Sequence, residues 1–214
     1  MDDLREREKR AAAEAAALLV TAGDRVGLGT GSTVAHLLVA LARRRLQVRC
    51  VATSPETERA ARDAGLTVDP FTGAEPLDIA IDGADQIAAD GWLIKGGGGA
   101  HTREKIVAAA ARRFVVIASS DKLVERLAPP VPIEVMAFGI DATRARLGAV
   151  TIRDAPRSPD GGVIADYTGA VDDPAALAAW LSAQPGVVEH GLFAPTLVTD
   201  VLVGRGGAVE RVRP

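Results

Sequence analysis

Short, continuously apolar runs alternate with helical segments along roughly the first 120 residues of the chain. The apolar runs lie at residues 25–28, 46–52, 77–81, 92–94 and 114–118. The segment before the first run predicts a helix at residues 4–20, and segments between later runs predict helices at residues 33–45, 55–64 and 102–111. Strands that are apolar throughout, rather than alternating with polar residues, are typical of a parallel sheet covered by helices on both faces.

A cluster of prolines, Pro129, Pro130 and Pro132, interrupts this pattern and marks a domain junction. The region beyond it predicts short strands at residues 133–136, 150–152, 162–167 and 187–189. It also predicts a helix starting near Thr143 and another at 174–182, capped by Asp172 or Asp173. We expect the strand at 201–203 to return to the main sheet. The α/β chain would then have a catalytic domain at 1–128 plus 200–214 and a small α+β domain at 129–199.

Polar clusters follow four of the predicted strands, at residues 30–33, 82–85, 95–99 and 119–122. In a parallel sheet, ligands bind beyond the carboxyl ends of the strands. Four strand ends that all carry candidate ligands therefore predict a binding site at this edge of the sheet.

The segment 95–105 carries the strongest chemical signal. Four consecutive glycines, which have no side chain, can turn several backbone N–H groups toward one anion or oxyanion. Lys95 precedes these glycines, and Glu104 follows them at the start of a predicted helix. A carboxylate becomes an effective general base when partial burial lifts its pKa toward neutrality. The alternative, a first-turn glutamate that only complements the helix dipole, is disfavoured by the adjacent oxyanion donors.

The glycine- and hydroxyl-rich segment 27–33 follows a strand and opens a helix, as phosphate-binding turns do. A dinucleotide site would need an acidic residue after the next strand, which instead ends at Thr53 and Ser54 without one. A tight turn capped by Ser32 or Thr33 remains the structural alternative.

Asp82 and Asp85 follow a strand and could share protons or bind sugar hydroxyls. The alternatives are a divalent-cation site or an Asp-rich turn with a helix cap. Lys122, after another strand, is a candidate phosphate ligand. The three histidines are scattered and show no metal-ligand spacing.

Composition narrows the function classes. The 214 residues are 48% hydrophobic and carry a formal charge of −3, which argues against nucleic-acid or membrane-surface binding. Cys50 is the single cysteine, as expected in a reducing compartment. The charged N-terminus is unlike a signal peptide, and the apolar stretch 11–20 is too short to span a bilayer. We expect a soluble cytoplasmic protein.

Together, the segments 29–33, 82–85, 95–98, 102–105 and 191–193 resemble ribose-5-phosphate isomerase of the A type, in order and over nearly the whole chain. The resemblance implies a Rossmann-like domain with a second, smaller ferredoxin-like α+β domain. It implies interconversion of D-ribose 5-phosphate and D-ribulose 5-phosphate in the non-oxidative pentose phosphate pathway. It further implies that no cofactor or metal is used and that the assembly is a homodimer or homotetramer.

The resemblance also assigns roles. Glu104 would move a proton between C2 and C1 through a cis-enediolate, while Asp82 would assist ring opening and Asp85 would bind hydroxyls. The implied oxyanion donors are Lys95 and the N–H groups of Gly96, Gly97 and Gly98. The implied phosphate ligands are Ser32, Thr33, Lys122 and Lys9. Further substrate contacts are implied for Thr30, Gly31, Gly83 and Ala84.

The chain departs from the family at Gln86, Gly99 and His101, and His101 could alter the pH dependence. The family's segment corresponding to residues 138–166 is not recognisable, which bears on assembly and interdomain packing. Two alternatives remain. An amino-sugar phosphate deaminase would need an Asp-His-Glu set that is not visible here. A non-catalytic sugar-phosphate sensor of the regulator type would carry a DNA-binding domain, for which about 25 residues before the first strand are too few.

Overall fold

The computed structural model describes residues 2–212, which form two compact units. The first unit comprises the chain up to residue 84, residues 103–122 and the chain from residue 196. The second unit comprises residues 85–102 and 123–195. Packing therefore groups the segment that holds Lys95 and the glycines with the second unit. The domain boundaries predicted above, 1–128 plus 200–214 and 129–199, stay a prediction.

The first unit is built on a seven-stranded sheet in which six strands are parallel and the edge strand β15 is antiparallel. In pairing order the strands are β15 (Ala208–Val212), β14 (Asp200–Arg205), β7 (Phe114–Ser119), β4 (Ile79–Asp82), β1 (Arg25–Leu28), β2 (Arg49–Ala52) and β3 (Thr67–Val68). Strands β4 and β7 are buried along their whole length. The predicted parallel sheet is confirmed, as is the return of the last part of the chain to it.

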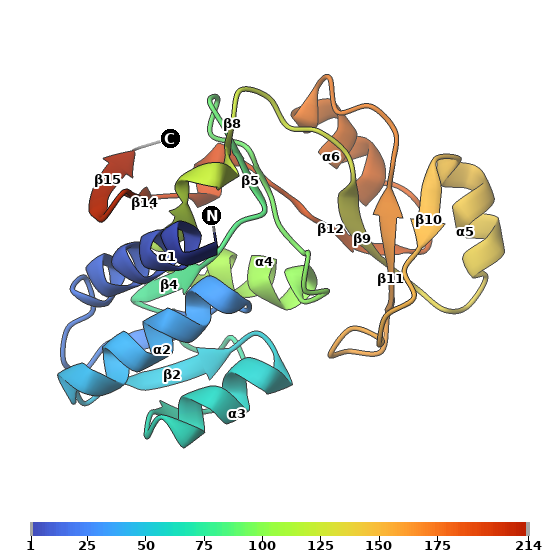
Figure 1. Cartoon of the computed structure of the whole chain (residues 1–214). Helices are drawn as coiled ribbons and strands as arrows, with labels where there is room; N and C mark the ends of the chain where they lie inside the picture. The colour runs from blue at the N-terminus through green and yellow to red at the C-terminus, as the bar shows by residue number, and fades with distance from the viewer. Residues whose placement is uncertain (1, 213–214) are drawn as a thin grey trace. The chain divides into compact units, whose positions relative to one another are not determined.

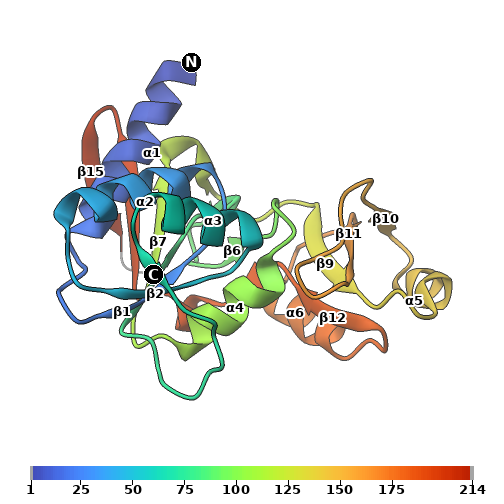
Figure 2. The same cartoon turned by 90° about the horizontal axis from the view of Figure 1, so that it is seen from below.

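Helices cover both faces of this sheet (Figures 1 and 2). The core on one face joins α1 (Asp2–Ala17), α2 (Ser32–Arg44) and α3 (Pro55–Asp63) to alternate strand residues such as Val26 and Leu28. Because side chains alternate across a strand, Gly27 points to the other face, toward α4 (His101–Ala110). A Cβ atom at Gly27 would lie 2.5 Å from Val107 Cγ1, so glycine permits α4 to pack this closely.

The second unit holds a four-stranded antiparallel sheet in the order β10-β11-β9-β12. The chain passes through β9 (Val131–Val135), α5 (Ile140–Leu147), β10 (Val150–Ile152), β11 (Val163–Tyr167), α6 (Pro174–Ser182) and β12 (Val187–His190). This β-α-β-β-α-β order is the ferredoxin-like arrangement. The predicted fold class is therefore confirmed. Asp173, one of the two predicted caps, accepts bonds from the first N–H groups of α6.

A second small sheet in the same unit has the order β13-β6-β5-β8. Its strands are β13 (Leu192–Phe193), β6 (Leu93–Ile94), β5 (Gln86–Ala88) and β8 (Leu123–Val124). Apolar residues of both small sheets, such as Ile94 and Ile133, share one core. Most of these strands were not predicted, because two or three residues are too few to show a periodic pattern. Among the described residues, no helix combines the length and apolarity needed to cross a membrane.

The carboxylate of Glu8 on α1 ties this helix to two loops of the first unit. It accepts bonds from the N–H and hydroxyl of Ser120, at 3.0 and 2.8 Å, and from the N–H of Gly206 at 2.9 Å. Burial would raise the pKa of Glu8, but these hydrogen bonds outweigh it and lower the pKa below its usual value of 4.5. Glu8 thus holds the short helix η1 (Ser120–Lys122), which carries Lys122.

We expect Glu8→Ala to lower the free energy of unfolding by about 2–3 kcal/mol at pH 7, because three donors lose a charged acceptor. The pKa of Glu8 is lower in the folded state. The contribution of Glu8 to the free energy of unfolding is therefore complete above pH 4.5, and it is lost as the pH falls through the lower pKa of the folded state. Urea unfolding at pH 7 and at pH 3 measures both effects. Glu14→Ala, at an exposed glutamate of the same helix, is the control, and an equal loss in both variants would contradict the assignment.

Cys50 lies fully buried in β2, and burial together with the charge of Asp69 raises the pKa of its thiol to about 11. At pH 8 roughly 0.1% of such a thiol is ionised, so it should react very slowly with a disulfide reagent. We expect no labelling of the native protein within minutes and complete labelling in denaturant. Rapid labelling of the native protein would show that β2 is accessible.

Candidate functional site

The polar loops of the first unit meet where the strand order reverses. From β1 the chain moves outward to β2 and β3, and then returns to the other side of β1 as β4. In open α/β sheets this switch point is where ligands bind. The buried carboxylate of Asp82, at the end of β4, accepts bonds from Thr30 N–H at 3.1 Å and Gly83 N–H at 2.7 Å. The predicted strand-end residues 30 and 82 are thus brought together.

Gly29 makes this contact possible. A Cβ atom at Gly29 would lie 1.8 Å from Asp82 Oδ1 and 2.5 Å from Asp82 Cβ. The requirement is therefore for space and not for an unusual backbone angle. Thr57 Oγ1 also donates to the carbonyl of Gly29 at 2.9 Å, which fixes the loop from the side of α3.

The N-terminus of α2 has no side-chain cap. Gly31 is the N-cap residue, with φ of 121°, and neither Ser32 nor Thr33 caps the helix through its side chain. The hydroxyl of Thr30 instead bonds to that of Thr53 at 2.8 Å. The alternative of a turn capped by Ser32 or Thr33 is therefore wrong. An uncapped helix N-terminus that begins with two hydroxyl residues suits an anion such as phosphate.

Lys9 on α1 is linked to α2 through a shared carboxylate. Its Nζ lies 2.6 Å from Glu6 Oε1, and Glu6 Oε2 lies 2.9 Å from Nε2 of His36 on α2. Hydrogen bonds from Lys9 and His36 lower the pKa of Glu6 to about 2, so this carboxylate is ionised at neutral pH. His36 stands one helical turn after Ser32 on α2, which places the Lys9 network beside the first turn of that helix.

Within the second unit, residues 96–99 form a tight glycine turn. Gly99 N–H donates to the Gly96 carbonyl at 3.0 Å, and Gly97 N–H donates to Asp85 Oδ2 at 2.8 Å. Gly96 has φ of 104°, and a Cβ there would approach both His101 and Pro132 to within 3 Å. Asp85 and the glycines, which were predicted separately, are therefore in direct contact.

Lys95 stands immediately before this turn and is only 2% exposed. Its backbone N–H donates to the Gly191 carbonyl at 2.8 Å. Its Nζ lies 5.4 Å from the centre of the Phe193 ring, a distance at which a cation is attracted to the aromatic face. The segment 191–193 thus supports Lys95.

Glu104 lies in the first turn of α4 and is 4% exposed. His101, the first residue of the same helix, is fully buried behind the turn at Gly96. Thr102 donates from its hydroxyl to the buried carboxylate of Glu134 on β9.

Asp82 and Asp85 lead into strand β5 and not into a helix, so the helix-cap alternative for that pair is wrong.

Two further residues were missed by the sequence analysis. Glu134 is a buried carboxylate in an otherwise apolar strand, a signal that the sequence did contain. Arg153 contacts the glycine turn but belongs to the segment 138–166, in which no motif was recognised. Across residues 2–212, no group of three or more His, Cys, Asp or Glu side chains is arranged to hold a metal ion.

Within the first unit, this α/β protein thus has an uncapped helix N-terminus that begins with two hydroxyl residues and a buried glutamate in the first turn of α4. Within the second unit, it has a buried lysine beside a glycine turn. Groups of these kinds are typical of enzymes that move a proton beside the carbonyl of a phosphorylated substrate.

Comparison with known proteins identifies the family. The family model described as ribose 5-phosphate isomerase A (phosphoriboisomerase A) matches residues 49–207. A ribose-5-phosphate isomerase A from Halobacterium salinarum is 49% identical over 97% of this chain and 96% of its own length. This chain belongs to the ribose 5-phosphate isomerase A family, as the sequence analysis predicted.

Solved structures of isomerases of this family have the same fold as this chain. The isomerase A of Methanocaldococcus jannaschii has a TM-score of 0.90 and 35% identity, covering 100% of this chain and 99% of that one. A D-ribose-5-phosphate isomerase in complex with phospho-erythronic acid has a TM-score of 0.91 and 31% identity, covering 98% and 99%.

We expect Gly29→Ala to destabilise the protein by about 1–3 kcal/mol, because the new methyl group collides with Asp82. Catalytic activity should also fall, by more than the loss of folded protein accounts for, because Asp82 must move. Thermal unfolding and a steady-state assay measure the two effects. In an Asp82→Gly background the colliding atoms are gone, so the same substitution should cost little stability. Additive losses in the double variant would contradict the proposed collision.

Proposed function

We propose that this protein interconverts D-ribose 5-phosphate and D-ribulose 5-phosphate, with Glu104 as the general base. The observation that carries the proposal is a buried first-turn glutamate directly after a lysine–glycine turn, in a chain 49% identical to a named isomerase. The chain is an aldose–ketose isomerase and, by the reaction of its family, acts in the pentose phosphate pathway. A structural relative was solved with phospho-erythronic acid, a phosphorylated sugar acid, which supports a sugar-phosphate ligand.

The phosphate group would bind at the N-terminus of α2. The uncapped N–H groups after Gly31, the hydroxyls of Ser32 and Thr33 and the positive end of the helix dipole all favour an anion there. Lys9 and Lys122 stand on α1 and η1, which Glu8 and Ser120 join. Both lysines would add positive charge to the phosphate site.

The reacting end of the open-chain sugar would lie against Glu104. Its carboxylate would take the proton from C2 of the aldose while the electrons move toward the C1 oxygen, giving a cis-enediolate. The same proton would then return to C1, which gives the ketose without net change in the enzyme. Asp82 would assist ring opening, and Asp85 would bind hydroxyls or move a proton between the two oxygens.

The charge that develops on oxygen would be stabilised by Lys95 and by the N–H groups of the turn at residues 96–98. Donors held in place before the reaction are worth more than donors that must reorganise during it. Gly97 N–H already donates to Asp85, so its contact with substrate would be shared with that carboxylate. Thr30, Gly31, Gly83 and Ala84 would line the bound sugar phosphate.

We propose further that the protein is a homodimer or homotetramer that acts without a cofactor, as the family resemblance implies. The formal charge of −3 and the single buried cysteine support a cytoplasmic location without nucleic-acid or membrane partners. The alternative of a non-catalytic sugar-phosphate sensor is not favoured, because the chain keeps both Lys95 and Glu104.

We expect purified, EDTA-treated protein to convert ribose 5-phosphate to ribulose 5-phosphate, and Glu104→Gln to reduce kcat by about 10²-fold or more. Glutamine keeps the size of the side chain but cannot accept the proton. The rate of ribulose 5-phosphate formation measures the effect.

Glu210→Gln, at an exposed glutamate of β15, is the matched control and should retain full activity. An active Glu104→Gln variant would remove Glu104 as the base. Binding of ribose 5-phosphate by an inactive wild-type protein would favour the sensor.

A further inference from the structure

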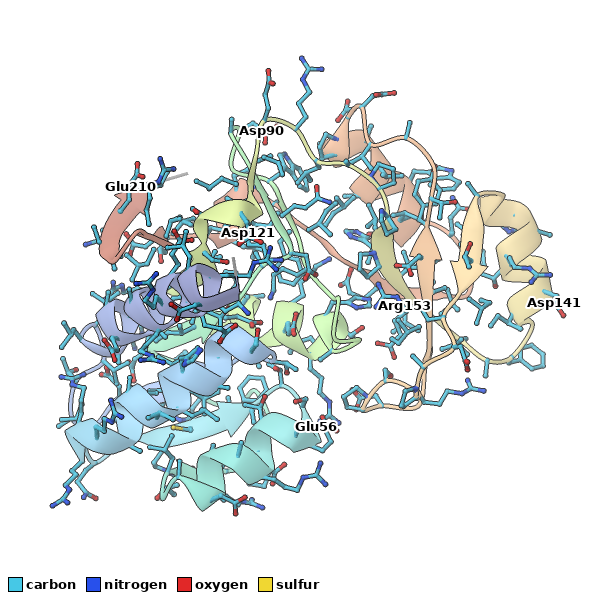
Figure 3. All side chains as sticks on the ribbon, in the orientation of Figure 1. Glu56, Asp90, Asp121, Asp141, Arg153 and Glu210 are labelled. Carbon is cyan, nitrogen blue, oxygen red and sulfur yellow. The ribbon has the colours of Figure 1, made fainter. Side chains whose placement is uncertain are left out.

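The hairpin between β10 and β11 places a guanidinium group on the glycine turn. Arg153 directly follows β10 (Figure 3). Its Nε and Nη2 donate to the two carboxylate oxygens of Asp166 at 2.7 and 2.6 Å. Its Nη1 donates to the carbonyls of Gly96 and Gly97, each at 3.0 Å. Four of the five N–H donors of the guanidinium group are therefore used.

These two carbonyls determine where the neighbouring N–H groups point. In a trans peptide the C=O of one residue and the N–H of the next lie in one plane and point in opposite directions. A Gly96 carbonyl turned toward Arg153 turns the N–H of Gly97 away from it, and the Gly97 carbonyl does the same for Gly98. The bond from Gly97 N–H to Asp85 agrees with this geometry.

The turn itself does not enforce that orientation. Glycine peptides rotate more freely than any others, and Gly97 and Gly98 are exposed. The bond from Gly99 N–H to the Gly96 carbonyl constrains only the first of the two peptide groups. The contact of Arg153 with the Gly97 carbonyl constrains the second.

The hairpin that carries Arg153 is itself anchored. Ser158 donates to Glu134, and the N–H of Gly162 donates to Ser158 Oγ at 2.9 Å. Gly162 leaves room for that carboxylate, since a Cβ there would lie 2.1 Å from Glu134 Oε1. Arg153 is only about one fifth exposed and is oriented by Asp166.

We propose that Arg153 is a positioning residue that holds the Gly96 and Gly97 carbonyls and so directs the two N–H groups that follow them: that of Gly97 toward Asp85, with which the substrate would share it, and that of Gly98 toward the oxyanion of the substrate. Hydrogen bonds to the carbonyl of a peptide also polarise its N–H and strengthen it as a donor. A lysine lacks the planar, forked set of N–H donors, so it could not bind both carboxylate oxygens of Asp166 and also hold both carbonyls. The proposal rests on the isomerase function proposed above.

The test compares Arg153→Met with Arg157→Met, at an exposed arginine of the same hairpin. Loss of ordered oxyanion donors should lower kcat by about 10–100-fold with KM changed by less than about threefold. Arg153→Lys should lie between the wild type and Arg153→Met, and Arg157→Met should resemble the wild type.

Binding of two phosphorylated probes separates positioning from general disruption. Phospho-erythronic acid carries a carboxylate that resembles the charged oxygens of an enediolate, while erythritol 4-phosphate carries a neutral alcohol there. Calorimetry with Arg153→Met should show at least about tenfold weaker binding of the acid and nearly unchanged binding of the alcohol.

Equal weakening of both probes, or an unchanged kcat, would overturn the proposal. If Arg153→Met does not fold, the same two comparisons on Arg153→Lys decide the question. If the wild type does not isomerise ribose 5-phosphate, the proposed function fails, and the probe comparison still tests Arg153.

Discussion

The carboxylate of Asp82 is the group on which the polar loops of the first unit depend. It lies at the switch point of the sheet, where β1 and β4 run side by side. Its bonds to Thr30 and Gly83 fix the loops after both strands. The carboxylate fits there because Gly29 has no side chain with which it would collide. A buried carboxylate without such donors would carry a large desolvation cost. The same bonds that satisfy Asp82 therefore also shape the approach to the N-terminus of α2.

In the second unit, the direction of the backbone N–H groups in the glycine turn has to be set. A turn made of glycines can bring backbone donors close to a substrate but does not by itself choose their direction. Here side chains outside the turn make that choice. Asp85 holds one N–H, Arg153 holds two carbonyls, and His101 packs behind the turn. Flexibility in the sequence is thus converted into a defined conformation by tertiary contacts.

The sequence predicted the long elements well, because each had a strong local signal. The strand at 25–28 and the helix at 174–182 have the predicted bounds, and Asp173 caps that helix. The short strands β5, β8 and β13 were missed, since they pair with partners far away in the chain. The structural alternative of a turn capped by Ser32 or Thr33 was wrong, because Gly31 takes the cap position. Glu134 was overlooked although a carboxylate within an apolar strand was visible in the sequence.

The sequence by itself determined the parallel sheet, the positions of the strand ends and the motifs that carry the chemistry. Apolar runs and glycine clusters act within a few residues, so they can be recognised from a single chain. Only the tertiary structure decided that Glu6, which binds Lys9, also bonds to His36, and that Arg153 donates to the carbonyls of Gly96 and Gly97. The bonds from Glu6 to His36 and from Arg153 to the glycine turn join residues roughly 30 to 60 positions apart. They depend on how β-strands and helices pack, a property that no local pattern of residues encodes.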